Sequence, residues 1–238
     1  MDAKAIIHKT RDDYNRIAAH FSDTRIQAWP EFELFNSFVK DGQCILDWGC
    51  GNGRLLNCLQ THHRMRYCGV DQSKELLKIA RKLWKKELKA GWAKFFCNAS
   101  QTVKFDKDYF DLAFFVASLF HLPTDELRFK VLQQTWQQLK PKGKIVILVW
   151  NLGSDWAKEK LKKDWKVIDE HNFIIPWKKS NGEVICERYY HHFTKIELQG
   201  LLKRAGFTID KIDYFGKGNW SDSRGGRNLV AIASKPSV

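Results

Sequence analysis

The chain has 238 residues, of which 44% are hydrophobic, and its net charge is +13. This length can bury one substantial core, and no apolar run is long enough to span a bilayer, since the longest, 112–120, contains Ser118. The N-terminus has no apolar signal segment, which predicts a cytoplasmic protein, and the positive excess favours a polyanionic partner, nucleic acid first.

Up to residue 150 the hydrophobic pattern predicts helices alternating with short strands. The expected helices are 10–21, 31–39, 54–60, 73–89 and 124–139, the last closed by Pro141-Lys142-Gly143. The expected strands are 44–48, 67–70, 94–97, 111–116 and 144–150. Such alternation predicts an α/β fold in which a doubly wound, mostly parallel sheet carries helices on both faces.

The pattern breaks after the fifth strand. Residues 151–187 are rich in lysine and hold three tryptophans. A helix at 194–204, ended by Gly206, and two closing strands at 207–215 and 229–234 follow, and the strands are expected to form a terminal antiparallel hairpin. We therefore expect a seven-stranded sheet within a single domain, 1–238. Its parts are an N-terminal helical cap at 1–40, a ligand-binding core at 41–150, a basic insertion at 151–193, and a closing helix and hairpin at 194–238.

The most informative stretch is "ILDWGCGNGR" at 45–54. A strand runs directly into Gly49, Gly51 and Gly53 and then into a helix, so the backbone can turn sharply and a ligand can approach it closely. Asp71 ends the next strand, where a carboxylate can accept hydrogen bonds from both hydroxyls of a ribose.

A dinucleotide site is the first alternative for this loop, but it requires the spacing G-x-G-x-x-G. Arg54 stands where the third glycine would be, and Asp47 would repel a pyrophosphate. Asp47 instead suits a cofactor that carries an ammonium group. A glycine-rich turn with no ligand is the other alternative.

The D-x-G-x-G-x-G pattern resembles the binding motif of class I S-adenosylmethionine-dependent methyltransferases, which implies a Rossmann-like fold. The resemblance implies S-adenosylmethionine as cofactor, with Asp47 and the glycine backbone holding its methionyl part and Asp71 its ribose. The implied cofactor-binding residues are Asp47, Gly49, Cys50, Gly51, Asn52, Gly53, Arg54, Asp71, Gln72, Asn98, Ala99, Phe115 and Val116.

Three further segments, in order, resemble the tRNA wobble-uridine carboxymethyl methyltransferases, which esterify a 5-carboxymethyl uridine in the anticodon. They are "HFSDTRIQAWP" at 20–30, a histidine-bearing turn at 118–128, and "RYYHHF" at 188–193. The resemblance implies tRNA, at its anticodon region, as partner, and it leaves open a small zinc-binding activator subunit. The implied acceptor-side residues are Arg25, His121, Arg188, Tyr189, Tyr190 and His191.

The acceptor chemistry fits these residue types. A carboxylate has a pKa of about 4 and is ionised at pH 7, so it needs alignment with the methyl donor rather than a general base. Arg25 and Arg188 could hold the anion, and His121 and His191 could donate hydrogen bonds. Strand geometry sends Tyr189 and Tyr190 to opposite faces, so we expect only one of them to reach the site and stack on a base.

Cysteines and lysines yield weaker signals. The six cysteines form no C-x-x-C pair, which predicts buried free thiols and no metal site. A stripe of five basic residues on the helix 73–89 is explained by solvation at least as well as by RNA, whereas seven lysines within the insertion are expected to contact phosphate. The stripe is Lys74, Lys78, Arg81, Lys85 and Lys89, and the insertion lysines are Lys158, Lys160, Lys162, Lys163, Lys166, Lys178 and Lys179.

Two rival functions stay open on the sequence. One is a small-molecule methyltransferase that acts on an acid, a phenol or a quinone precursor, with the net charge incidental. The other is a non-catalytic domain that binds the cofactor and RNA. The intact glycine motif together with Asp71 argues against the second.

Overall fold

The computed structural model describes residues 2–25, 29–98 and 103–237. The helices are α1 Ala3–Asp23, α2 Glu31–Asn36, α3 Arg54–Leu59, α4 Lys74–Leu83, α5 Lys85–Lys89, α6 Asp125–Gln138, α7 Asp155–Leu161 and α8 Lys195–Arg204, with a 3-10 turn, η1, at Leu119–His121. The strands are β1 Cys44–Trp48, β2 Arg66–Asp71, β3 Ala93–Cys97, β4 Phe110–Val116, β5 Leu139–Trp150, β6 Lys166–Val167, β7 Asn172–Lys178, β8 Val184–His191, β9 Thr208–Gly216, β10 Asn219–Ser221 and β11 Asn228–Ser234.

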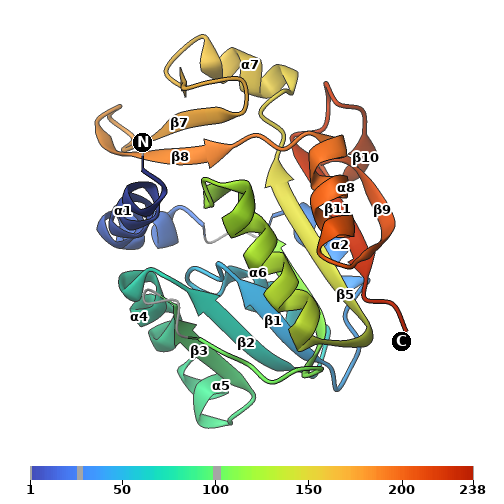
Figure 1. The fold of residues 1–238 in the computed structure, drawn as a ribbon. Coiled ribbons are helices and arrows are strands. Elements are labelled where there is room, and N and C mark those ends of the chain that lie inside the picture. Colours follow the sequence, from blue (N-terminus) through green and yellow to red (C-terminus); the bar gives the residue numbers. More distant parts are fainter. Residues whose placement is uncertain (1, 26–28, 99–102, 238) are drawn as a thin grey trace.

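The main sheet has the strand order β10-β9-β11-β5-β4-β1-β2-β3 (Figure 1). Strands β1 to β5 pair in parallel, and β11 runs antiparallel between β5 and β9. The predicted parallel core with an antiparallel closing pair is thus confirmed. The described part of the sheet has one strand more than the seven expected, because the glycine-rich turn after β9 folds back as the short strand β10.

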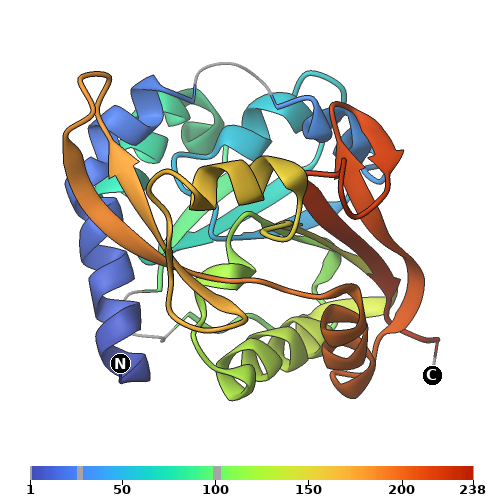
Figure 2. The ribbon, with the colours of Figure 1, turned by 90° about the horizontal axis from the view of Figure 1, so that it is seen from above.

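Helices cover both faces of this sheet, as Figure 2 shows from above. On one face α6 and α8 pack through Leu132 and Leu198 against β5, and on the other α2, α3 and α4 pack through their apolar sides against β1. Every residue of β1 is buried, as expected for a central parallel strand. The sheet therefore holds its strand ends, and the loops that follow them, on a rigid base.

Two boundaries differ from prediction. The helix expected at 73–89 is divided at Trp84, whose indole turns inward and donates a hydrogen bond to the carbonyl of Asn52 at 3.1 Å. The segment 141–143, expected to close the helix before a strand at 144–150, lies within β5, which begins at Leu139, and Lys142 takes a left-handed φ of 64° there.

The insertion builds an element that the sequence did not predict. Strands β6, β7 and β8 form a separate antiparallel sheet, which lies beside α1 (Figure 1). Ile17 of α1 packs against Trp177 and Cys186 of this sheet. The first helix and the insertion thus close over the carboxyl ends of the main strands together.

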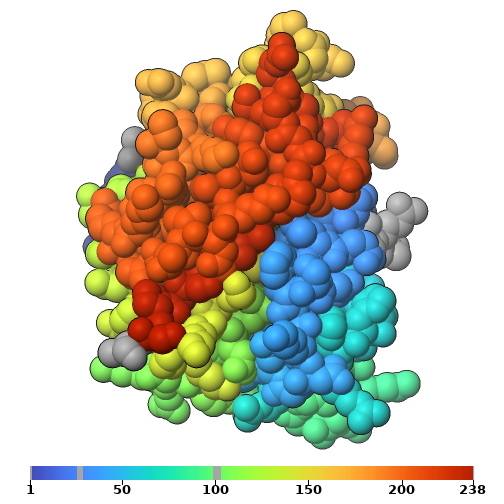
Figure 3. Space-filling view, turned by 90° about the vertical axis from the view of Figure 1, so that its right-hand side faces the viewer, coloured from blue at the N-terminus to red at the C-terminus, as the bar shows by residue number. Residues whose placement is uncertain are grey.

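The early and late parts of the chain also meet on the opposite side. Figure 3 shows the blue segment around α2 directly beside the red C-terminal strands. The side-chain amide of Asn228 donates a hydrogen bond to the Glu31 carboxylate at 3.0 Å, and both residues are buried.

No helix within the described ranges is long and apolar enough to cross a membrane. Across the same ranges, no three His, Cys, Asp or Glu residues come together as metal ligands would. All six cysteines are free thiols, five of them buried.

Candidate functional site

A cavity of about 330 Å³ lies at the carboxyl ends of the parallel strands, where such sheets bind ligands. The glycine loop forms its floor, and α1, η1 and β8 form its other walls. Of the residues predicted from the sequence, those that line it are Arg25, Asp47, Gly49, Cys50, Gly51, Asn52, Arg54, Asp71, Gln72, Asn98, Phe115, Val116, His121, Arg188 and Tyr190.

The glycine loop is tied to the end of β2 by its own backbone. The N–H groups of Gly49 and Cys50 donate to the carbonyl of Val70 at 2.7 and 3.0 Å. A Cβ on Gly49, at φ 77°, would lie 2.3 Å from Ser118 Cβ, so the position excludes a side chain. At Gly51 the nearest atom, on Phe21, would be 3.8 Å away. Gly51 therefore leaves its backbone open for the close approach of a ligand.

Gly53 does not line the cavity. At φ 79° a Cβ there would lie 2.5 Å from the indole Nε1 of Trp84. This glycine admits the tryptophan that breaks α4 from α5, so its role in the structure is packing rather than ligand contact.

Two acids of the loop region lie at the cavity wall, Asp47 buried and Asp71 half-buried. The Tyr67 hydroxyl donates to Asp47 Oδ2 at 2.5 Å, yet burial raises the pKa of Asp47 to about 7. Asp71 accepts hydrogen bonds from the N–H groups of Gly51 and Ser73 at 2.9 and 2.7 Å. Burial raises the pKa of Asp71 as well, and these N–H donors oppose the shift. A cationic group bound beside Asp47 would hold it ionised.

The rest of the wall fits a ligand that has both polar and planar parts. Two residues that line it, Trp48 and Asn52, each have a buried polar atom, Nε1 and Oδ1, with no hydrogen-bond partner in the described part of the chain. Asn98 is fixed by a hydrogen bond from its N–H to the Asp71 carbonyl at 2.8 Å. Ala99, also predicted to bind the cofactor, lies outside the described residues. A nucleoside cofactor with an ammonium tail thus finds partners along this wall.

A chain of hydrogen bonds joins three elements on the acceptor side of the cavity. Arg188 of β8 donates to the Tyr14 hydroxyl at 3.1 Å, and that hydroxyl lies 2.8 Å from His121 Nε2. His121 Nδ1 lies 2.8 Å from the carbonyl of Tyr189, so Nδ1 must carry the proton and Nε2 must accept from Tyr14. Burial, with Arg188 adding to it, lowers the pKa of His121 to about 3. His121 is therefore a neutral ring with both nitrogens engaged, and it has no free N–H for an acceptor.

Tyr14 is a site residue that sequence reasoning missed. In the sequence, Tyr14 follows the apolar pattern that predicts the buried face of α1. Only the packing of α1 against β8 brings its hydroxyl between Arg188 and His121. No local pattern near residue 14 signals this role.

The two predicted arginines share one aromatic ring. The guanidinium carbons of Arg25 and Arg188 lie 5.2 and 4.8 Å from the ring centre of Trp177. In the described part of the chain neither guanidinium forms an ion pair with a carboxylate. Arg25 donates a hydrogen bond to the Thr24 carbonyl, and Arg188 donates one to the Tyr14 hydroxyl. Burial and then the neighbouring Arg188 lower the pKa of Arg25. Two adjacent cations without an anion make this end of the cavity a site for a negatively charged group.

The tyrosine pair divides as the strand geometry predicts. Tyr190 faces the cavity together with Arg188, and Tyr189 faces away from it. The Tyr190 ring already packs against Trp150 and Phe120, with ring centres 5.1 and 4.7 Å away. These contacts hold the ring in the cavity wall, and stacking on a base of the acceptor stays a prediction.

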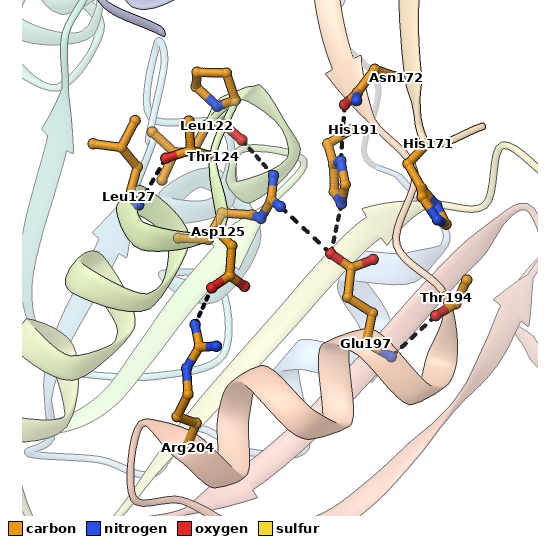
Figure 4. Close-up of polar contacts among 12 residues, drawn as sticks. Leu122, Thr124, Asp125, Leu127, His171, Asn172, His191, Thr194, Glu197 and Arg204 are labelled. Atoms are coloured by element: carbon orange, nitrogen blue, oxygen red, sulfur yellow. Dashed lines mark hydrogen bonds and ion pairs between the residues drawn. The ribbon is translucent and has the colours of Figure 1, made fainter. Parts of the chain in front are cut away.

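His191 does not reach the cavity, which corrects the expectation that it faces the acceptor. Its Nδ1 lies 3.0 Å from Asn172 Oδ1 and its Nε2 lies 2.7 Å from Glu197 Oε1 (Figure 4). The same Glu197 oxygen lies 3.6 Å from Arg128 of α6. Because it alternates with Tyr190 along β8, His191 points to the far face, where it fastens the insertion to α8 and α6.

Comparison with known proteins agrees with the fold and the loop. Residues 45–143 match a family model described as a methyltransferase domain. Two curated relatives are named tRNA (carboxymethyluridine(34)-5-O)-methyltransferase. The one from Xenopus tropicalis is 26% identical over 90% of this chain and 40% of its own length, and the one from Schizosaccharomyces pombe is 27% identical over 87% of this chain and 91% of its own. The chain thus spans less than half of the first relative.

Among solved structures, a Haloferax volcanii protein in complex with the Trm112 methyltransferase activator superposes with a TM-score of 0.68. The two sequences are 18% identical, and the superposition covers 96% of this chain and 98% of the Haloferax chain. At this identity the similarity shows the fold alone. Three observations agree: the sheet topology, the glycine loop hydrogen-bonded to Asp71, and the match to the family model. Residues 45–143 form a methyltransferase domain, and its cofactor is S-adenosylmethionine.

Proposed function

We propose that the protein methylates the carboxylate of a 5-carboxymethyl-type wobble uridine in tRNA, with S-adenosylmethionine as methyl donor. The observation that carries the proposal is the pair Arg25 and Arg188. Both line the cavity that the glycine loop floors, and in the described residues neither has a carboxylate partner. The names of the two curated relatives support the same acceptor.

The residues around the cavity suit an in-line transfer without a base. The cofactor supplies an electrophilic methyl group on a sulfonium. An acceptor carboxylate is already ionised at pH 7, so no proton has to be removed. The neutral, fully engaged His121 agrees with this, since it holds Tyr14 and β8 in place instead of exchanging protons. Arg188 and Arg25 would orient the two carboxylate oxygens, and most of the rate would come from that alignment.

A direct test is methyl transfer from labelled cofactor to total tRNA. The label should enter tRNA, and mild alkali should release it as methanol, because a methyl ester hydrolyses whereas a C- or N-methyl group does not. The assay is run with and without the activator subunit, because the Haloferax neighbour was solved with one and we extend the proposal to a small zinc-binding partner of that kind.

The rival functions appear as other outcomes of the same assay. Label found in a metabolite extract and absent from tRNA would indicate a small-molecule methyltransferase. Cofactor binding with no transfer to either pool would indicate a non-catalytic domain. Alkali-stable label in tRNA would keep RNA as substrate and overturn the carboxylate.

Asp71→Ala is expected to weaken cofactor binding by about 10²-fold or more. The change removes the ribose ligand and also the acceptor that holds the Gly51 N–H, so the loop loses its anchor. Isothermal titration with S-adenosylmethionine measures the effect, and urea unfolding checks the fold. The control is Asp41→Ala, which removes an exposed carboxylate that likewise accepts a backbone N–H, from Arg64. Unchanged affinity in Asp71→Ala would contradict the assignment.

A further inference from the structure

The positive charge of the chain is distributed differently from what its lysine-rich segments suggest. The insertion, 151–193, has eight Lys and Arg against seven Asp and Glu, so it is nearly neutral. Residues 74–94 have eight Lys and Arg against two Glu, so about half of the net charge of +13 lies in this short segment.

Ion pairs neutralise most of the insertion lysines. Five of its seven lysines pair with a carboxylate close by. The pairs are Lys158–Asp155, Lys162–Glu159, Lys166–Glu187, Lys178–Asp164 and Lys179–Glu183. The expectation of a basic insertion that contacts phosphate is therefore not supported by its charge.

Helices α4 and α5, with the start of β3, carry exposed lysines that are mostly unpaired, in contrast to those of the insertion. Within the described residues, six of them have no carboxylate partner, and only Lys78 is paired, with Glu75. We call these six residues the α4–α5 surface; they are Lys74, Lys82, Lys85, Lys86, Lys89 and Lys94. The buried side of α4, with Leu77 and Ala80, holds the helix against the sheet and fixes the lysines outward.

The α4–α5 surface begins at the mouth of the cavity. Gln72 and Leu76, on either side of Lys74, line the cavity itself. From there the ten residues of α4 run about 15 Å away from it, toward α5 at the lower end of Figure 1. Leu83, 60% exposed, lies between the lysines. A row of cations that leads to a reaction cavity is the electrostatic arrangement that a polyanionic chain fits.

We propose that the α4–α5 surface binds the phosphodiester backbone of the acceptor RNA while one nucleotide of that RNA enters the cavity. The inference rests on the proposed function for the identity of the acceptor. Binding of this kind releases counterions from the RNA, so it is strongly weakened by salt and depends on the number of lysines engaged.

The test compares two sets of four charge reversals. Lys82, Lys85, Lys86 and Lys89 are changed together to Glu in one variant, and Lys158, Lys160, Lys162 and Lys163 in the other. Filter binding of end-labelled total tRNA should show at least a 30-fold loss of affinity in the first variant and less than a 3-fold loss in the second. The slope of log affinity against log salt should also fall only in the first. Equal losses in both variants, or none in the first, would overturn the proposal.

Two further readouts separate this inference from the proposed function. Cofactor affinity should be unchanged in both variants, which shows that the fold is intact. Methyl-ester formation by the unaltered protein is scored independently of RNA binding. If the unaltered protein esterifies tRNA and the α4–α5 reversals leave tRNA affinity unchanged, only the proposal for the α4–α5 surface is overturned. If the α4–α5 reversals weaken tRNA binding but the unaltered protein forms no methyl ester, only the proposal of a carboxylate acceptor is overturned.

Discussion

Arg188→Ala is expected to lower kcat/KM for the RNA acceptor by about 10²- to 10³-fold and to leave S-adenosylmethionine affinity within about twofold. Arg188 is 4% exposed, lies over the Trp177 ring and is proposed to hold the acceptor carboxylate. Loss of one preorganised donor to a reacting oxyanion costs about 3–4 kcal/mol of transition-state stabilisation. Steady-state methylation of tRNA and titration of the cofactor measure the two quantities separately.

The matched control is Arg16→Ala. Arg16 lies on the same helix as Tyr14 and donates to the Ile185 carbonyl at 3.3 Å, so it touches the insertion sheet without lining the cavity. Its kcat/KM should stay within about twofold of the unaltered protein. Arg188→Lys keeps the positive charge but cannot form a bidentate hydrogen bond to a carboxylate, so it should recover only part of the activity. Equal losses of cofactor affinity and turnover in Arg188→Ala would place Arg188 on the cofactor side and contradict the model of the site.

Tyr14→Phe adds a test of the hydrogen-bond chain. It removes the hydroxyl between Arg188 and His121 and leaves the ring that packs against both. We expect a smaller loss of kcat/KM, about 10-fold, because Arg188 keeps its place over Trp177 and loses one partner. If Tyr14→Phe is as damaging as Arg188→Ala, the tyrosine contacts the acceptor itself.

The parts of the site that local sequence specifies were predictable. Three alternating glycines after an apolar strand determine the shape of a loop whatever the rest of the chain does, and Asp71 stands at a strand end because its neighbours are buried. The predicted strand at 44–48 matches β1, and the loop residues line the cavity, except Gly53, which packs against Trp84. That exception depends on a residue 31 positions away.

The acceptor side was less predictable because contacts between distant segments create it. Arg188 and Tyr190 face the cavity because β8 pairs with β7 in a sheet that the sequence pattern did not signal. The same pairing turns His191 toward Glu197. The next residue, His192, is half-buried near Gly153, and burial lowers its pKa to about 4. A one-residue change of register would exchange these roles, and composition alone cannot fix the register.

Cofactor affinity is expected to fall as the pH is lowered from 7 to 5.5, by up to tenfold per pH unit. In the unligated protein burial raises the pKa of Asp47 to about 7, so below that pH the group is protonated and must lose its proton to pair with an ammonium group. Titration calorimetry over this range avoids the interval near pH 8, where an α-amino group itself titrates.

Two variants test the assignment of this pH dependence to Asp47. Asp47→Asn should bind the cofactor more weakly and with a flatter pH profile. Tyr67→Phe removes the hydrogen bond that lowers the Asp47 pKa, so its affinity should begin to fall at higher pH.

The stability of the unligated protein should change with pH in the opposite sense. Between the ordinary carboxyl pKa of about 4 and the folded value of about 7, the folded chain holds a proton on Asp47 that the unfolded chain has released. The contribution of Asp47 to the free energy of unfolding is therefore fully present below pH 4 and is lost as the pH rises to 7. Urea unfolding should find Asp47→Asn more stable than the unaltered protein at pH 8 and nearly equal to it at about pH 3.5, below the ordinary carboxyl pKa. A difference independent of pH would mean that Asp47 is ionised in the empty site, and the loss of affinity at low pH would then need another titrating group, with Asp71 first because burial raises its pKa too.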